Sequence, residues 1–172
     1  MKKLDNINFR NPKIEDAEEI IKFYQKMGGE TTFLSFEENE YPLDEEEQKK
    51  SIEYMQKEPH CTMIIAFADK EIVGIGTIYS ESKVKAKHCG GLGIVVKKAY
   101  QGMGIGTHIM SQLIEFCKTN GVTTKISLET RCDNQKAVTL YENLGFEVEG
   151  RLRNAALVEG VYHDVYVMGM ML

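Results

Sequence analysis

The sequence predicts a single mixed α/β (α+β) domain, in which one twisted, mostly antiparallel sheet of six to seven strands carries about four helices. Helical and strand-like apolar spacings follow one another in the order β-α-α-β-β-β-α-β-α-β-β, which favours one sheet with helices on its faces. A chain of 172 residues is long enough to bury roughly 70% of its unfolded surface. No repeat, linker or low-complexity stretch divides residues 1–172, so we expect one domain.

The N-terminal part predicts one short strand and two helices. The strand is INFRN at 7–11, and the helix that follows should end at the paired glycines 28–29. Its apolar stripe consists of Ile14, Ala17, Ile21, Tyr24 and Met27. Asp44 and Glu47 have the spacing of a capping box, so a second helix should begin there and end before Pro59.

The middle of the chain predicts a hairpin, a third strand and a helix. CTMIIAFA at 61–68 and IVGIGTIY at 72–79 are separated by DKE, which is typical of a β-hairpin. The unbroken apolar run LGIVV at 92–96 predicts a strand buried on both faces. A helix should then run up to Gly121. Its apolar stripe consists of Ile105, Ile109, Leu113 and Phe116.

The C-terminal part predicts three further strands and one short helix. TTKISLET at 123–130 has strand character, and DNQKAVTLYENLG at 133–145 has helical spacing with Gly145 at its end. FEVEGRLR at 146–153 and YHDVYVMGM at 162–170 complete the sheet.

Composition and spacing exclude several classes of protein. A net charge of −5 argues against nucleic-acid binding, which needs a basic surface. No apolar stretch approaches the roughly 18 residues of a membrane span, and the N-terminal lysines precede no signal-peptide core. We therefore expect a cytoplasmic protein without a membrane partner. Neither the cysteines nor the histidines have metal-ligand or disulfide spacing, so no metal is expected. They are Cys61, Cys89, Cys117, Cys132, His60, His88, His108 and His163.

The segment from Glu30 to Glu47 holds eight carboxylates and neither Lys nor Arg. One interpretation is a solvated loop and helix start, because acidic residues in a first turn complement the helix dipole. The other is an electrostatic attraction for a cationic substrate. Glu30, Glu37 and Glu38 are the candidate substrate-binding residues.

The segment YQGMGIGT at 100–107 places three glycines immediately before a helix. A Walker-type loop would need a Lys before Thr107, and a dinucleotide fingerprint would place the third glycine one residue later and near the first strand. The remaining ligand class is a pyrophosphate, which backbone N–H groups at a helix N-terminus can hold. The alternative is a glycine-rich helix entry without a ligand, which is disfavoured because glycine destabilises a helix by about 1 kcal/mol relative to alanine.

Two blocks of sequence resemble a known family. IVVKKAYQGMGIGTHIM at 94–110 resembles the Q/R-x-x-G-x-G/A signature of the GCN5-related N-acetyltransferases (the GNAT family), and DNQKAVTLYENLGF at 133–146 resembles their N-x-x-A-x-x-L-Y-x-x-L-G-F block. The blocks have the order and spacing of the family, and the resemblance covers almost the whole chain. The ending at 145–168 is similar to members that acetylate polyamines, protein N-termini or small amines.

The resemblance implies an acyl-CoA N-acyltransferase fold and acetyl-CoA as the donor. The backbone of the third strand would pair with the pantetheine arm where two strands of the sheet separate, and the amides of the glycine segment would bind the pyrophosphate. The implied donor-binding residues are Ile94, Val95, Val96, Gln101, Gly102, Met103, Gly104, Ile105, Gly106, Thr107 and Asn134. For Asn134, the spacing alone favours helix capping.

Acetyl transfer to an amine needs a base for the amine and benefits from an acid at the departing thiolate. Tyr141 stands at the family position of that acid, although the spacing of the helix also fits a tyrosine that only packs in the core. The position of the base must differ from that in many relatives, because Gly91 occupies the strand position where they carry a glutamate. Glu129 lies five residues before Asn134, as in the ribosomal-protein alanine N-acetyltransferases, and burial would raise its pKa.

Three alternatives for this site stay open. Glu129 is also what an outward-facing polar strand position would give, in which case water or a residue such as Glu30 would be the base. Cys132 has no histidine near it in sequence, and the family transfers the acetyl group directly, so we expect no covalent acetyl-enzyme. A non-catalytic acetyl-CoA-binding regulator would keep the glycines but has no need of Tyr141.

The expectation of a homodimer rests only on dimers being the commonest oligomers.

Overall fold

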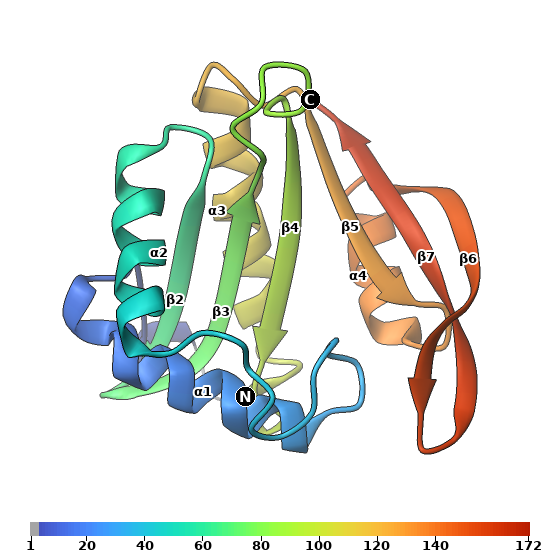
Figure 1. Ribbon diagram of the computed structural model, residues 1–172, viewed down its shortest axis with the longest axis horizontal. Helices are drawn as coiled ribbons and strands as arrows, with labels where there is room; N and C mark the ends of the chain where they lie inside the picture. The colour runs from blue at the N-terminus through green and yellow to red at the C-terminus, as the bar shows by residue number, and fades with distance from the viewer. Residues whose placement is uncertain (1–3) are drawn as a thin grey trace.

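The computed structural model describes residues 4–172, which form one seven-stranded sheet with helices on both faces (Figure 1). The strands are β1 (Ile7–Arg10), β2 (Thr62–Ala68), β3 (Glu71–Tyr79), β4 (Cys89–Val96), β5 (Lys125–Arg131), β6 (Glu147–Val158) and β7 (Val161–Met171). The helices are α1 (Ala17–Glu30), α2 (Glu45–Lys57), α3 (Ile105–Thr119) and α4 (Gln135–Asn143), with 3-10 turns η1 (Leu4–Asn6), η2 (Ile14–Asp16) and η3 (Lys98–Tyr100). The predicted order of strands and helices is confirmed.

The strands lie in the order β1-β2-β3-β4-β5-β7-β6. Every neighbouring pair is antiparallel except β4 and β5, which are parallel and pair over only three positions, from Cys89 with Lys125 to Gly91 with Ser127. Beyond these positions the two strands separate, as Figure 1 shows by the widening gap between their ribbons. The sheet therefore has a discontinuity in its middle.

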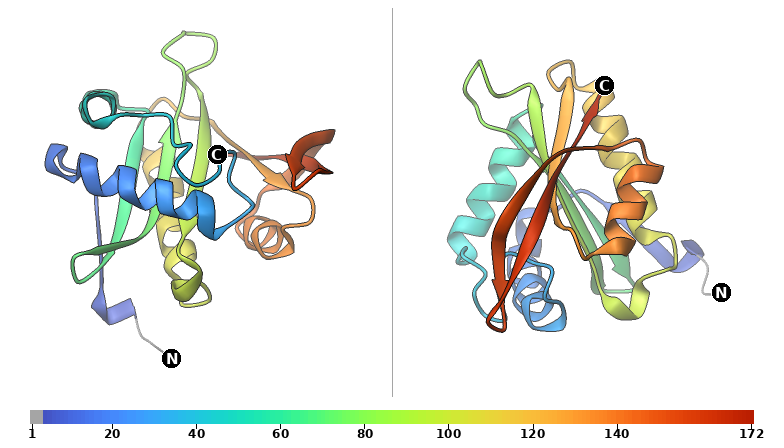
Figure 2. Two further views of the ribbon diagram at one scale, coloured as in Figure 1. Left: turned by 60° about the horizontal axis from the view of Figure 1, so that its bottom comes forward. Right: turned by 90° about the vertical axis from the view of Figure 1, so that its right-hand side faces the viewer.

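Each face of the sheet has its own core. The helices α1 and α2 cover one face, where Ile20, Met27 and Ile52 pack against Ile65 and Ile75. The helix α3 covers the other face, and α4 follows it along the chain onto the same side (Figures 1 and 2). No helix within residues 4–172 is long and apolar enough to cross a membrane.

The capping predictions for α2, α3 and α4 are confirmed. The Asp44 side chain accepts a hydrogen bond from the Glu47 amide at 2.9 Å, and Glu47 accepts one from the Asp44 amide at 3.0 Å. Gly121 and Gly145, which follow α3 and α4, have the positive φ angles of helix-ending glycines, 73° and 99°.

The helix α1 ends at Glu30, so the predicted end at the paired glycines is correct to within one residue. Its buried face is offset, since Ile20 and Phe23 are buried while Ile21 is only half-buried. Gly28 serves close packing instead of helix termination: a Cβ at this position would collide with the carbonyl group of Glu37. This glycine lets the α1–α2 loop, residues 31–44, run directly against the helix.

The prediction that β4 is buried on both faces is wrong. Its last residues, Ile94, Val95 and Val96, are only half-buried. They lie beyond the paired positions of β4 and β5, so the missing neighbour leaves them partly accessible. The C-terminal hairpin is longer than predicted, since β6 extends to Val158 through two irregular pairings with β7.

Candidate active site

The separation of β4 from β5 leaves one edge of β4 open. The opposite edge is fully paired, because β3 follows β4 as far as Gly74 with Val96. On the β5 side, ladder pairing within the described residues stops at Gly91. Backbone N–H and C=O groups on such an edge can pair with an extended ligand that carries amide groups of its own. At residues 94–96, where the family resemblance implies pairing with the donor, this edge of β4 therefore has no strand partner among residues 4–172.

The open edge leads through η3 to the glycine turn and the N-terminus of α3. Gly102 and Gly104 have φ angles of 76° and 86°, so the backbone itself requires glycine there. Gly106 differs, because a Cβ would meet its nearest atoms at an ordinary 3.8 Å or more. Neither conformation nor packing demands glycine at 106, which is consistent with a backbone that a ligand approaches closely.

The amides of this turn are available as hydrogen-bond donors. From Gly102 to Thr107, none of them donates to an acceptor within the described part of the chain, as expected for the first turn of a helix. Nearby, the Gln101 side-chain amide donates to the Val96 carbonyl at 3.1 Å, which connects the turn to the end of β4. Free amides and the positive end of the α3 dipole together suit an anionic group.

Tyr141 lies on α4 with its ring in the core and its hydroxyl at the surface. The residue is 7% exposed, and its ring contacts Phe146 edge to face, with centroids 5.9 Å apart. Its hydroxyl makes no hydrogen bond within residues 4–172, yet it is not among the enclosed unpaired polar atoms. Burial raises the pKa of Tyr141 to about 12, so the phenol keeps its proton at neutral pH.

Asn134 caps α4, as its spacing predicts. Its side-chain oxygen accepts a hydrogen bond from the Ala137 amide at 3.4 Å. The capping oxygen leaves the side-chain NH₂ group free of protein partners within the described residues, so a contact with a ligand is compatible with the cap.

Glu129 faces the opposite side of the sheet from Tyr141. Ile126 and Leu128 point into the α3 core, and side chains alternate along a strand, so Glu129 and Arg131 point toward the α1–α2 side. Glu129 is exposed, so the expected burial is absent, and a role as the base would rest on its position beside the opening between β4 and β5. Gly91, which occupies the position where many family members carry the base, pairs with Ser127 on that same face. Gly91 and Glu129 therefore lie on the same side of the opening between β4 and β5.

The acidic candidates lie in and beside the α1–α2 loop. Glu37 and Glu38 are exposed, and the Glu37 amide donates to a carboxylate oxygen of Glu40 at 3.0 Å. Glu30 is half-buried at the end of α1, where its carboxylate accepts a hydrogen bond from the Lys98 amide at 2.5 Å. One of its oxygens is therefore committed to η3, next to the glycine turn.

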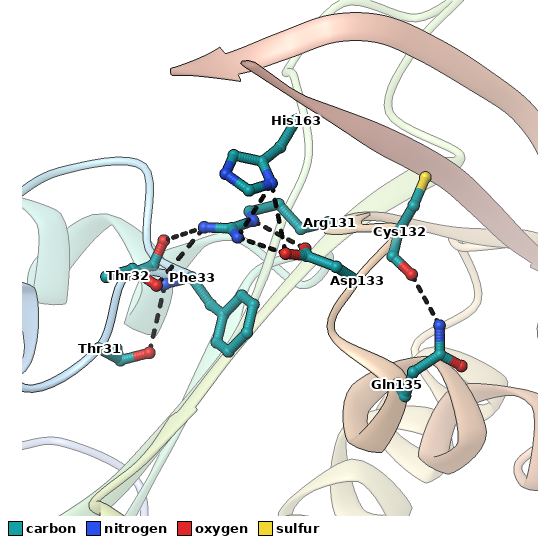
Figure 3. A network of polar contacts seen from close by, with 8 residues as sticks. All are labelled: Thr31, Thr32, Phe33, Arg131, Cys132, Asp133, Gln135 and His163. Atoms are coloured by element: carbon teal, nitrogen blue, oxygen red, sulfur yellow. Dashed lines mark hydrogen bonds and ion pairs between the residues drawn. The ribbon is translucent and has the colours of Figure 1, made fainter. Parts of the chain in front are cut away.

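Arg131 is a buried charge at this site that belongs to none of the sequence motifs. Arg131 is 8% exposed and lies among Thr32, Asp133 and His163 (Figure 3). Its Nε and Nη2 atoms donate to the two oxygens of Asp133 at 2.9 and 2.5 Å. An arginine at the end of a strand, on the face of a candidate base, is the signal that could have found it. No group of three metal-ligating side chains gathers within residues 4–172.

Comparison with known proteins connects this geometry to a family. A family model described as the acetyltransferase (GNAT) family matches residues 30–146, which include the open strand, the glycine turn and all of α4. An L-amino acid N-acetyltransferase of Escherichia coli K12 is 30% identical over 116 residues, covering 67% of this chain and 72% of that protein.

Two solved structures have the same fold. A GNAT-family acetyltransferase from Streptococcus pneumoniae is similar with a TM-score of 0.93 and 29% identity, covering 96% of this chain and 99% of that one. The yncA protein of Salmonella typhimurium, solved with acetyl-CoA, has a TM-score of 0.84 at 18% identity, covering 98% and 95%. The chain therefore belongs to the GNAT family of acetyltransferases, the acetyl-CoA-dependent N-acetyltransferases.

Proposed function

We propose that this enzyme transfers the acetyl group of acetyl-CoA to a primary amine that carries further positive charge, either a polyamine-like small molecule or a basic protein N-terminus. The observation that carries the proposal is the open edge of β4, which runs directly into a turn of free amides. A strand edge and an anion-binding turn in this order match one ligand that has both amides and a pyrophosphate.

In this proposal the donor lies along β4 and the glycine turn. The backbone of Ile94, Val95 and Val96 holds the pantetheine arm, and the amides from Gly102 to Thr107 hold the pyrophosphate. Gln101 keeps the turn against the end of β4 through its bond to the Val96 carbonyl. Asn134 contacts the donor arm with the NH₂ group that its capping role leaves free.

The chemistry is a direct transfer within a ternary complex. The amine gives a proton to Glu129, directly or through water, and its lone pair forms the new N–C bond as the C–S bond breaks. The departing thiolate takes a proton from the Tyr141 hydroxyl, which holds its proton at neutral pH. Glu129 and Tyr141 point to opposite faces of the sheet, so base and acid act from opposite sides of the opening.

The charge around the acceptor side supports a cationic acceptor. Glu129, Glu37 and Glu38 are exposed acids on or near this side, whereas the buried guanidinium of Arg131 is neutralised by Asp133. A hydrogen bond from Arg131 also holds the pKa of Asp133 below its usual range, so that carboxylate is ionised at neutral pH. A free amino acid would need a cation for its own carboxylate, and Arg131 is already occupied.

The test is CoA release with a panel of acceptors: spermidine, a peptide with a basic N-terminal sequence, free L-amino acids and a simple monoamine. Turnover with spermidine or the basic peptide at the highest kcat/KM is the expected result. A preference for the monoamine or for free amino acids would contradict the cationic acceptor. Binding of acetyl-CoA without turnover of any amine would indicate a non-catalytic regulator.

A further inference from the structure

A short stretch of chain crosses the opening between β4 and β5 on the α1–α2 side. We call Glu30–Thr32 the crossing segment. At one end, the Glu30 carboxylate accepts a hydrogen bond from the Lys98 amide, two residues after β4 ends. At the other end, the Thr32 carbonyl accepts one from Arg131 Nη1 at 2.9 Å, at the last residue of β5. Three residues thus connect the ends of the two strands that separate.

Arg131 joins this crossing segment to two further parts of the site. Its other donors hold Asp133, in the β5–α4 connection. Its Nη2 atom also lies 3.2 Å from Nδ1 of His163, on β7 in the C-terminal hairpin. Figure 3 shows the guanidinium between these groups, which come from three separate segments of the chain.

Phe33 completes the arrangement beside the crossing segment. The Arg131 guanidinium lies 4.7 Å from the centroid of its ring, a cation–π distance. The Phe33 side chain is nevertheless 45% exposed. Arg131 therefore fixes a loop that presents an aromatic ring and a backbone to the solvent on the same face of the sheet as Glu129.

We propose that Arg131 is a positioning residue for the amine acceptor, through its hold on the crossing segment and the C-terminal hairpin. Its planar guanidinium donates to Thr32 and Asp133 at once and also contacts His163, which a lysine ammonium cannot reproduce with the same geometry. The proposal rests on the proposed function insofar as it concerns the acceptor. The placement of the crossing segment by Arg131 is independent of it.

The structure provides a matched control. Arg151 makes a similar pair with Asp164 on the C-terminal hairpin, with a side-chain distance of 2.5 Å. This pair does not reach the crossing segment. Arg131→Lys keeps the charge and should preserve folding, and Arg131→Gln removes the charge. Arg151→Gln removes an arginine–carboxylate pair that is more exposed, with 58% of the Arg151 side chain accessible against 8% of that of Arg131.

The first measurement is hydrogen–deuterium exchange of the folded variants, which needs no substrate. Arg131→Lys should increase exchange in residues 30–36 and near His163, and Arg131→Gln should increase it further. Arg151→Gln should leave residues 30–36 unchanged. Unaltered exchange there in Arg131→Lys and Arg131→Gln would overturn the placement of the crossing segment by Arg131.

The second measurement is steady-state kinetics with spermidine or the basic peptide, whichever the wild-type enzyme acetylates. Arg131→Lys should raise the KM for the amine at least fivefold and Arg131→Gln at least twentyfold, with the KM for acetyl-CoA within twofold of wild type. An unchanged amine KM, or equal rises for both substrates, would overturn the positioning role. If the wild-type enzyme acetylates no amine, the proposed function fails, while hydrogen exchange still decides the role of Arg131 in the fold.

Discussion

Tyr141 combines a packed ring with an accessible hydroxyl, so its two roles can be separated by removing one atom. We expect Tyr141→Phe to lower kcat by about 10²-fold, the lower end of the range for general acids. Affinity for acetyl-CoA and thermal stability should change little, because the ring stays against Phe146. Single-turnover rates and thermal melts check both statements.

The pH dependence of Tyr141 gives that prediction a second readout. Because burial raises its pKa to about 12, ionisation of the phenol should not reduce turnover below about pH 10 in the wild-type enzyme. A tyrosine that only packs would give a Tyr141→Phe enzyme with unchanged kcat.

Glu129 is the residue whose role depends most on a direct test. We expect Glu129→Gln to lower kcat/KM and to remove the limb of the pH–rate profile in which the base gains its proton. Ser127→Ala, on the same face of β5, is the control for a local change in the strand. If the pH profile of Glu129→Gln matches that of wild type, water or another carboxylate is the base.

At the scale of single residues, the sequence predicts local hydrogen bonds but not contacts between residues that are far apart in the chain. The capping box of Asp44 and Glu47 and the cap by Asn134 follow from spacing, because donor and acceptor are three residues apart. Arg131 meets Thr32 across 99 positions of the sequence. No periodicity or motif encodes such a pair, since the topology of the sheet brings the two residues together.

At the scale of single elements, the glycine turn separates backbone requirements from ligand requirements. We expect Gly106→Val to weaken acetyl-CoA binding at least tenfold while the melting temperature stays within a few degrees of wild type. The reason is that position 106 has an ordinary φ and room for a Cβ, so the new side chain would obstruct the ligand more than the fold. Isothermal titration calorimetry and thermal melts measure the two effects.

Gly150→Val is the matched control for this prediction. A Cβ at 150 meets nothing within 4 Å, and the residue lies on β6 at the edge of the sheet. Its affinity for acetyl-CoA should equal that of wild type. Equal affinity in the Gly106→Val enzyme would instead mean that the ligand does not approach this position.

In two elements the sequence pattern has a different physical reason from the predicted one. The paired glycines at the end of α1 predict a helix stop, yet Gly28 is needed because the Glu37 backbone lies against it. The apolar end of β4 was interpreted as doubly buried, yet its neighbour is missing. In both cases the local pattern is correct about the residue type, but its reason lies in where another segment of the chain is placed: the Glu37 backbone against Gly28, and β5 apart from the end of β4.

For the molecule as a whole, the uneven distribution of charge predicts a salt dependence. We expect the KM for spermidine to rise severalfold between low and high salt, because the screening length falls from about 10 Å at 0.1 M to about 3 Å at 1 M. The KM for a simple monoamine should rise less. Initial rates at 0.05 and 0.5 M NaCl compare the two acceptors.

Two double variants identify the charges that cause the salt dependence of the spermidine KM. Glu37→Gln with Glu38→Gln should reduce the salt dependence of the spermidine KM. Glu18→Gln with Glu19→Gln should not, because these acids are already paired with Lys22 on the exposed side of α1. Equal effects of both pairs would show that overall charge, not the α1–α2 loop, attracts the acceptor.

If acetyl-CoA pairs with the open edge of β4 as proposed, it also contributes to the stability of the folded protein. A ligand bound between β4 and β5 would take the place of a strand inside the sheet, although it comes from solution. Mass action then gives the folded state about 2.7 kcal/mol of additional stability when free ligand reaches a hundred times its dissociation constant.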